Sequence, residues 1–275
     1  NLEDFRYFYK FFRAPAFIPD VGRKCFLDRV LEGSQQYAVD VSDDLEHRVR
    51  YALKHLMRGF LEHPRNNLQS SPSEPPTEAT IQQIYDNTLI LLYRILFVLY
   101  AESRDLLPTE DPNYATDHSL ASLAADTHHR LKEGRYIIPT LTDYWARLCG
   151  IFDLINQGWK ELIPQYNGGL FSPRYPFLER NWIGNAALAK ALDFVTYTKN
   201  EERIAYRDLD LRHLWTIYEQ LIDQKPIYRE GKFQLATEKK AKRKPESRRI
   251  PDLDQNKSFG PNSRVPPSYF CESYP

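Results

Sequence analysis

The chain has 275 residues, of which 42% are hydrophobic and 13% aromatic, so it can bury one large core or two smaller ones. Its 37 basic and 37 acidic residues give a net charge of +0, which excludes a polycation that binds nucleic acid over its whole surface. Three scattered cysteines, Cys25, Cys149 and Cys271, exclude a disulfide framework or zinc site. The chain starts with polar and acidic residues rather than with a signal peptide. Together with the small number of cysteines, this start favours a cytoplasmic location.

The first 64 residues predict three helices from the spacing of their apolar side chains. A short aromatic-rich helix precedes Pro15, and a second helix covers residues 24–37. A third begins at Ser42, which we expect to be its N-cap, and ends at Pro64.

Residues 88–101 form the most apolar stretch of the chain. The stretch is shorter than the roughly 20 residues that a membrane helix needs, and it contains Arg94, so we expect a buried central helix over residues 78–106 and no membrane partner. Its centre is predicted to hold Leu92, Leu96 and Leu99. The preceding residues, 63–80, are rich in proline, serine and asparagine and are predicted to be a flexible insert.

The second half of the chain adds four predicted helices, over residues 119–132, 142–157, 185–198 and 208–223. Asp208 is expected to cap the last of them, and brief strand signals occur at residues 135–138 and 203–206. The predicted fold class is therefore mainly α, with one multi-helix, connector-like domain over residues 1–224.

A basic tail is predicted from Lys225 onward. Residues 225–249 hold ten Lys or Arg against three Glu, so the rest of the chain carries an excess of about seven negative charges. No helical period follows Ile250, and residues 225–275 are therefore predicted to be disordered. Weak, non-specific binding of DNA phosphates is expected there, to be lost when the residues after Gln224 are removed. The side chains concerned are Lys239, Lys240, Lys242, Arg243, Lys244, Arg248 and Arg249.

The glycine pair in YNGGLF, residues 166–171, resembles two kinds of phosphate loop only in part. A Walker loop needs Lys and then Ser or Thr after its second glycine, and a dinucleotide-binding loop needs three spaced glycines. Leu170 and Phe171 follow instead. We therefore predict a tight turn at positive φ that Tyr166, Leu170 and Phe171 fasten to the core.

Two polar clusters are interpreted as structural. The imidazole cluster lacks the spacing of ligand pairs on a helix and is predicted to be a solvated surface; its members are His118, Asp126, His128 and His129. The charged cluster of the central helix is predicted to be an internal ion-pair network, because a buried arginine needs a carboxylate partner, and a catalytic role is its alternative. Its members are Arg94, Glu102, Arg104 and Asp105.

A third group, Asp223, Glu238 and Lys240, matches the Glu-x-Lys ending of a metal-dependent nuclease site. Such a site needs a β-hairpin to bring its carboxylates together, and we see no strand pattern in this part of the sequence. No metal ligand is therefore predicted, and a nuclease remains an alternative function.

Five stretches in a fixed order carry a resemblance to a known family. They are FYKFFRAPAF (8–17), FLDRVLEGSQQYAVDVSDDLEHRV (26–49), YRILFVLYAESRDLLP (93–108), YNGGLF (166–171) and YRDLDLRHLWTIYEQLID (206–223). Together, over residues 5–223, they resemble the large bacterial type II restriction-modification proteins with an Eco57I-like adenine-specific DNA methyltransferase domain. In that family a helical connector joins an N-terminal nuclease-like region to a core that methylates adenine N6 with S-adenosylmethionine.

The chain departs from that family where the methyltransferase motifs would stand. Trp215 and Thr216 replace a common Gly-Ser pair, and no Gly-x-Gly occurs anywhere. The late Pro-Pro pair lies between Val265, which cannot accept a hydrogen bond from adenine, and Ser268, which cannot stack on it. The resemblance therefore implies a connector fragment without cofactor-binding or catalytic residues, inactive alone. The alternative is a free-standing helical interaction module.

Overall fold

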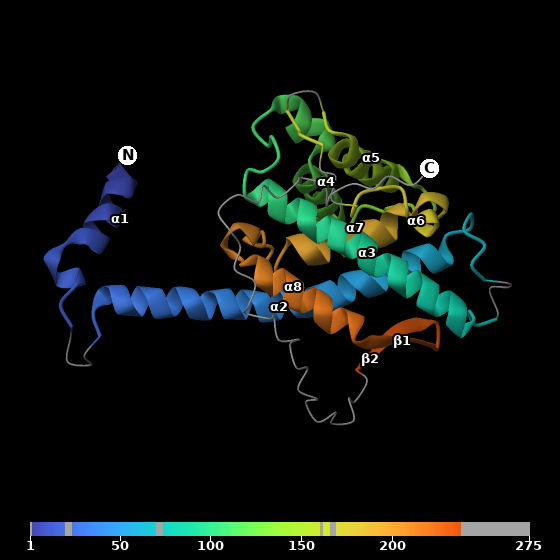
Figure 1. Ribbon diagram of the computed structural model, residues 1–275, viewed down its shortest axis with the longest axis horizontal. Coiled ribbons are helices and arrows are strands. Elements are labelled where there is room, and N and C mark those ends of the chain that lie inside the picture. The colour runs from blue at the N-terminus through green and yellow to red at the C-terminus, as the bar shows by residue number, and fades with distance from the viewer. Residues whose placement is uncertain (1, 20–23, 70–73, 160–161, 166–168, 238–275) are drawn as a thin grey trace, which may run out of the picture. The chain divides into compact units, whose positions relative to one another are not determined.

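The computed structural model describes residues 2–19, 24–69, 74–159, 162–165 and 169–237, and it is mainly helical, as predicted (Figure 1). Its helices are α1 (Leu2–Phe12), α2 (Phe26–Glu62), α3 (Glu78–Ser103), α4 (Leu120–Lys132), α5 (Asp143–Gln157), α6 (Pro176–Arg180), α7 (Asn185–Thr196) and α8 (Leu211–Ile222). Short helical turns are η1 (Ala14–Ala16), η2 (Tyr114–His118) and η3 (Tyr206–Asp208), and two strands follow, β1 (Gln224–Arg229) and β2 (Lys232–Thr237).

The second and third predicted helices are one continuous helix, α2, of 37 residues. Its N-terminus is capped by Cys25, whose Sγ accepts from the Asp28 amide at 3.4 Å while the Asp28 carboxylate accepts from the Cys25 amide at 2.9 Å. The predicted boundary at Ser42 is wrong, because no proline interrupts the segment. The nearby Asp44 carboxylate accepts from Arg48 Nε one turn later, at 2.6 Å, as an interior helical pair does.

The core is built around α3 and α7. Helix α7 packs against α2, α4 and α5, whereas α3 packs against α2, α4 and α8 (Figure 1). Leu92, Leu96 and Leu99 of α3 are 2%, 3% and 5% exposed, which confirms the predicted centre. By length and composition alone α3 could cross a membrane, but 67% of its most apolar window is buried, as in a core helix.

The structure differs from the expected tail at residues 224–237, which form an antiparallel β-hairpin. Arg229 pairs with Lys232, and the two loop residues, Glu230 and Gly231, have φ values of 51° and 72°, as a tight hairpin turn of the primed type requires. Phe233 of β2 is 6% exposed and belongs to the core. The strands were concealed in the sequence because their exposed positions include Lys225, Arg229 and Lys232, and a longer basic run follows them.

Three smaller expectations are also corrected. The strand expected at residues 135–138 is absent, and Arg203 forms only an isolated bridge with Tyr197. Asp210, rather than Asp208, caps α8 by accepting from the Arg212 amide at 3.0 Å. The insert predicted at residues 63–80 is partly fixed, because the Asn66 side chain bonds both the carbonyl and the amide of Trp182 at 2.8 Å.

Gly59 tests the close approach of α2 to the start of α7. A Cβ added there would lie 2.6 Å from Ile183 Cγ2 and 2.8 Å from Ala187 Cβ, whereas one added at Gly150, in α5, would meet nothing within 4 Å. We expect Gly59→Ala to lower the free energy of unfolding by about 1–3 kcal/mol through overpacking. Gly150→Ala should raise it by up to about 1 kcal/mol through helix propensity. Urea unfolding measures both, and equal effects of the two substitutions would contradict the packing described.

Candidate functional site

The residues predicted to bind DNA, from Lys239 to Arg249, lie outside the described residues, as do Glu238 and Lys240 of the alternative nuclease site. The third member of that site, Asp223, directly follows α8. Within the described residues, no group of three or more His, Cys, Asp or Glu side chains is arranged to hold a metal ion.

The described part of the glycine turn, from Gly169 onward, has a structural role. Gly169 has a φ of 68°, and the Ser172 hydroxyl donates to the Gly169 carbonyl at 2.9 Å. Phe171 is buried and Leu170 packs on the core, as predicted, whereas Tyr166 lies outside the described residues. The carbonyls of Leu170 and Ser172 accept from Arg94 Nε at 2.7 Å and Nη2 at 3.1 Å. A phosphate loop binds its ligand through N–H donors, whereas this turn presents carbonyl acceptors to a buried cation.

Arg94 is buried against main-chain oxygens and aromatic rings rather than against a carboxylate. It is 4% exposed, and its guanidinium carbon lies 5.5 Å from the ring centre of Phe152 and 5.3 Å from that of Tyr175. Burial lowers the pKa of Arg94, whereas the negative charge of Glu179 acts to raise it. The carbonyls and rings thus supply the stabilisation that the expected ion pair would have given.

Glu102 holds the start of α4. Its Oε1 accepts from the Leu120 amide at 2.7 Å and its Oε2 from the Ala121 amide at 2.8 Å, where a helix leaves its first N–H groups without partners. Burial raises the pKa of the Glu102 carboxyl, and the bonds from these amides act to lower it.

The predicted ion-pair network of the central helix is wrong, because its four members are not paired with one another. Besides Arg94 and Glu102, Arg104 donates to the Leu209 carbonyl at 3.2 Å, and Asp105 forms an ion pair with Arg207. The four charges thus connect α3 and the two residues after it to three parts of the chain, the glycine turn, the start of α4 and residues 207–209.

A cavity of about 560 Å³ lies between α2, α4 and α7. Its described lining consists of Asp44, His47, Arg48, Tyr51, His128, Leu131, Lys132, Asp193, Phe194, Tyr197, Thr198, Lys199 and Glu201. Arg48 Nη1 donates to the Tyr197 carbonyl at 2.6 Å, and Lys132 forms an ion pair with Glu201. Cations and carboxylates thus alternate around the opening.

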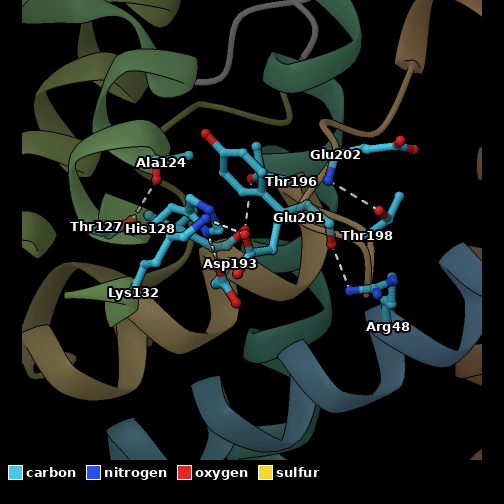
Figure 2. A network of polar contacts seen from close by, with 12 residues as sticks. Arg48, Ala124, Thr127, His128, Lys132, Asp193, Thr196, Thr198, Glu201 and Glu202 are labelled. Atoms are coloured by element: carbon cyan, nitrogen blue, oxygen red, sulfur yellow. Dashed lines mark hydrogen bonds and ion pairs between the residues drawn. The ribbon is translucent and has the colours of Figure 1, made fainter. Parts of the chain in front are cut away.

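His128 is the least expected member of this cavity, because the sequence predicts it on a solvated surface. Its side chain is only 19% exposed, and its Nδ1 lies 2.6 Å from Asp193 Oδ1 (Figure 2). The imidazole also stacks on the Tyr197 ring at 3.7 Å between ring centres. Asp193 lies 65 residues further along the chain, so no local spacing could have identified the pair.

The cavity is better suited to binding than to nucleophilic catalysis. A neutral His128 bonded to Asp193 through Nδ1–H keeps its lone pair on Nε2, the arrangement of an oriented base. The described lining, however, contains no serine or cysteine for such a base to activate. The Thr198 hydroxyl is engaged, because it accepts from the amides of Asn200 at 3.3 Å and Glu202 at 3.2 Å.

A stack of three rings separates this cavity from a second one along the same two helices. Phe194 of α7 stacks on both Tyr51 and His55 of α2, with ring centres 5.4 and 5.5 Å away. The second cavity, of about 220 Å³, is lined on the far side of this stack by Arg58 and Lys190, among others. Burial lowers the pKa of His55, and the charges of Lys190 and Arg58 add to the shift.

An apolar cavity of about 240 Å³ lies between α3 and α8. Its lining includes Tyr93, Phe97 and Tyr100 from α3 and Leu214 and Trp215 from α8. Trp215, at the position where the resembling family commonly has glycine, is 52% exposed. This large ring is therefore available to another protein surface.

Comparison of the chain with protein-family models, with curated proteins and with solved structures found no match.

Arg94→Lys tests how the glycine turn is held. The lysine ammonium keeps the charge but cannot bond both carbonyls in the fixed fork geometry of the guanidinium. We expect a loss of about 1–3 kcal/mol in the free energy of unfolding, because at least one buried carbonyl loses its donor. Arg130→Lys, at a partly exposed ion pair with Asp126, is the matched control and should change stability little. Equal losses in the two variants would contradict the role given to Arg94.

Proposed function

We propose that the chain acts as the helical connector region of a restriction-modification protein of the adenine-methylating type II class. The observation that carries the proposal is the convergence of three of the five stretches of the resemblance. Arg94, in the stretch 93–108, bonds the carbonyls of Leu170 and Ser172 in or beside YNGGLF. From the same stretch, Arg104 bonds the Leu209 carbonyl and Asp105 pairs with Arg207, both in the stretch 206–223.

This convergence supports a common origin for the motifs, because direct contacts give a physical reason for their joint occurrence. The motif residues in these contacts hold one core together, and each contact joins segments separated by at least 76 residues in sequence. A connector whose role is mechanical needs such an internally braced body.

Two exposed apolar surfaces support a role in joining other protein parts. Phe5, Phe8 and Phe12 recur at helical spacing along α1 and are 63%, 58% and 66% exposed. The second surface is the α3–α8 cavity with Trp215. In the proposal, neighbouring domains of the restriction-modification assembly cover these surfaces.

The reaction that intact restriction-modification proteins of this class catalyse belongs, in the proposal, to parts other than the connector. Methyl transfer from S-adenosylmethionine to adenine N6 takes place in the methyltransferase core, and this chain acts in the cytoplasm without a cofactor of its own. Its basic side chains from Lys239 to Arg249 add weak, sequence-independent affinity for DNA.

The exposed Trp215 also favours a second candidate function, a free-standing helical interaction module. The DNA sequence that follows the codon of Arg249 in the genome distinguishes the two. A methyltransferase core encoded there, in any reading frame, supports the connector, and its absence supports the module.

The β-hairpin bears on the nuclease alternative, because such a site needs a hairpin to bring its carboxylates together. The hairpin pairs Gln224 with Thr237, and these residues are the sequence neighbours of Asp223 and Glu238. The connector proposal expects no Mg²⁺-dependent cleavage of plasmid DNA by the purified chain. Cleavage that disappears in a Glu238→Ala variant, with Glu230→Ala at the hairpin turn as the unaffected control, would instead establish the nuclease.

Calorimetry with S-adenosylmethionine tests the connector proposal directly. We expect no binding heat, because the chain has no Gly-x-Gly loop through which its backbone could approach the methyl donor. A methyltransferase of the same class, titrated under the same conditions, is the positive control. A site of micromolar affinity in this chain would contradict the proposal.

A further inference from the structure

The two cavities on either side of the aromatic stack are successive parts of one groove between α2 and α7. The first is lined by residues 44–51 of α2 and by α7 from Asp193 onward, and the second by residues 55–62 of α2 and the first half of α7. Tyr51, Phe194 and His55 stack where the two parts meet. We call this feature the α2–α7 groove.

The four carboxylates that line the α2–α7 groove are all engaged by side chains of its own walls. Three form ion pairs, Asp44 with Arg48, Glu62 with Arg58 and Glu201 with Lys132, and Asp193 is hydrogen-bonded to His128. Each of these carboxylates therefore already has a partner within the groove.

Two lysines that line the α2–α7 groove, Lys190 and Lys199, are exposed and have no carboxylate partner among the described residues. Lys54 lines neither cavity but lies beside the groove, with its Nζ 5.4 Å from the centre of the Tyr51 ring, and it too has no carboxylate partner in the described part of the chain. The downward shift in the pKa of His55, caused mainly by burial, receives contributions from Lys190 and Arg58 that show their charges acting on one point. The described lining of the two cavities holds five Lys or Arg against four Asp or Glu, a small positive excess to which the neighbouring Lys54 adds.

We propose that the α2–α7 groove binds the phosphodiester backbone of DNA, with Lys54, Lys190 and Lys199 as the phosphate-contacting side chains. The lysine ammonium group, on its flexible side chain, can contact phosphate groups without recognising the base sequence of the DNA. Helix α7 has 12 residues and is about 18 Å long, which matches roughly five base-pair steps of 3.4 Å. The groove is separate from the basic tail, so the proposal stands whether or not the chain is a connector.

The occupant of the groove follows from charge complementarity. The aromatic rings of the groove already contact one another and Lys54: Phe194 stacks on Tyr51 and His55, and Lys54 lies over the Tyr51 ring. A peptide side chain would have to compete with these contacts for the ring faces. A phosphate backbone needs only the three unpaired ammonium groups, and its association is driven by the release of counterions.

The test uses the full chain and a short DNA duplex of mixed sequence, with binding measured by fluorescence anisotropy at several salt concentrations. The groove variant carries Lys190→Glu and Lys199→Glu. The control variant carries Lys10→Glu and Lys232→Glu, which make the same charge change at exposed positions in α1 and β2. We expect the slope of log K against log salt to become shallower by about 1–2 in the groove variant, since each lost phosphate contact removes about 0.9. The control should keep the slope of the natural chain.

A second experiment distinguishes DNA binding by the groove from DNA binding by the tail. In a full-length variant whose tail is neutralised to glutamine, we expect residual, salt-dependent DNA binding that the two groove substitutions then remove, in contrast to the sequence-based expectation that all binding is lost with the tail. The neutralised positions are Lys239, Lys240, Lys242, Arg243, Lys244, Arg248 and Arg249. Complete loss of binding on neutralising the tail alone would overturn the groove proposal and leave the connector proposal intact. Equal binding of polyglutamate and DNA by the tail-neutralised chain would also overturn it, because a non-specific cationic surface would then suffice.

Discussion

Helix α3 buries two opposite charges, Arg94 and Glu102, and does not pair them with each other. Each is bonded to main-chain groups of another segment, the guanidinium to the carbonyls of Leu170 and Ser172, the carboxylate to the first amides of α4. Since a buried charge without hydrogen bonds is strongly unfavourable, the core can close only when both segments lie in these positions. The glycine turn and α4 are thereby placed on opposite parts of one helix.

The placement of α4 has a consequence for the molecular surface. Helix α4 carries His128 and Lys132 to the opening of the α2–α7 groove, where they engage Asp193 and Glu201. With these carboxylates engaged, the remaining lysines of the groove present their charge to solvent. The buried charge of α3 and the exposed charge of the groove therefore belong to one arrangement, in which a rigid helical body holds a cationic surface. In the proposed connector, this surface is the part of the helical body that contacts the DNA backbone.

Much of this architecture could be predicted from the sequence, because helices are recognisable from the regular spacing of their apolar residues. The buried centre of α3 and the tight turn at Gly169 followed from local patterns alone. The groove could not be predicted, since His128 and Asp193 are distant in sequence and meet only when α4 packs on α7. The hairpin was missed for a different reason: the Glu230-Gly231 turn signal was available, but the surrounding lysines suggested a solvated chain. Likewise, a buried arginine was rightly expected to need partners, but the sequence could not reveal that carbonyls supply them.

Lysine footprinting of the full chain, with and without duplex DNA, tests most directly whether the helical body itself contacts DNA. Acetylation at low reagent concentration, read by mass spectrometry, reports the groove and the tail in one measurement. DNA should slow the modification of Lys54, Lys190 and Lys199 while Lys10 and Lys232 react as before. Protection confined to the tail lysines, with the groove lysines unchanged, would contradict a DNA-contacting body and reduce it to a scaffold.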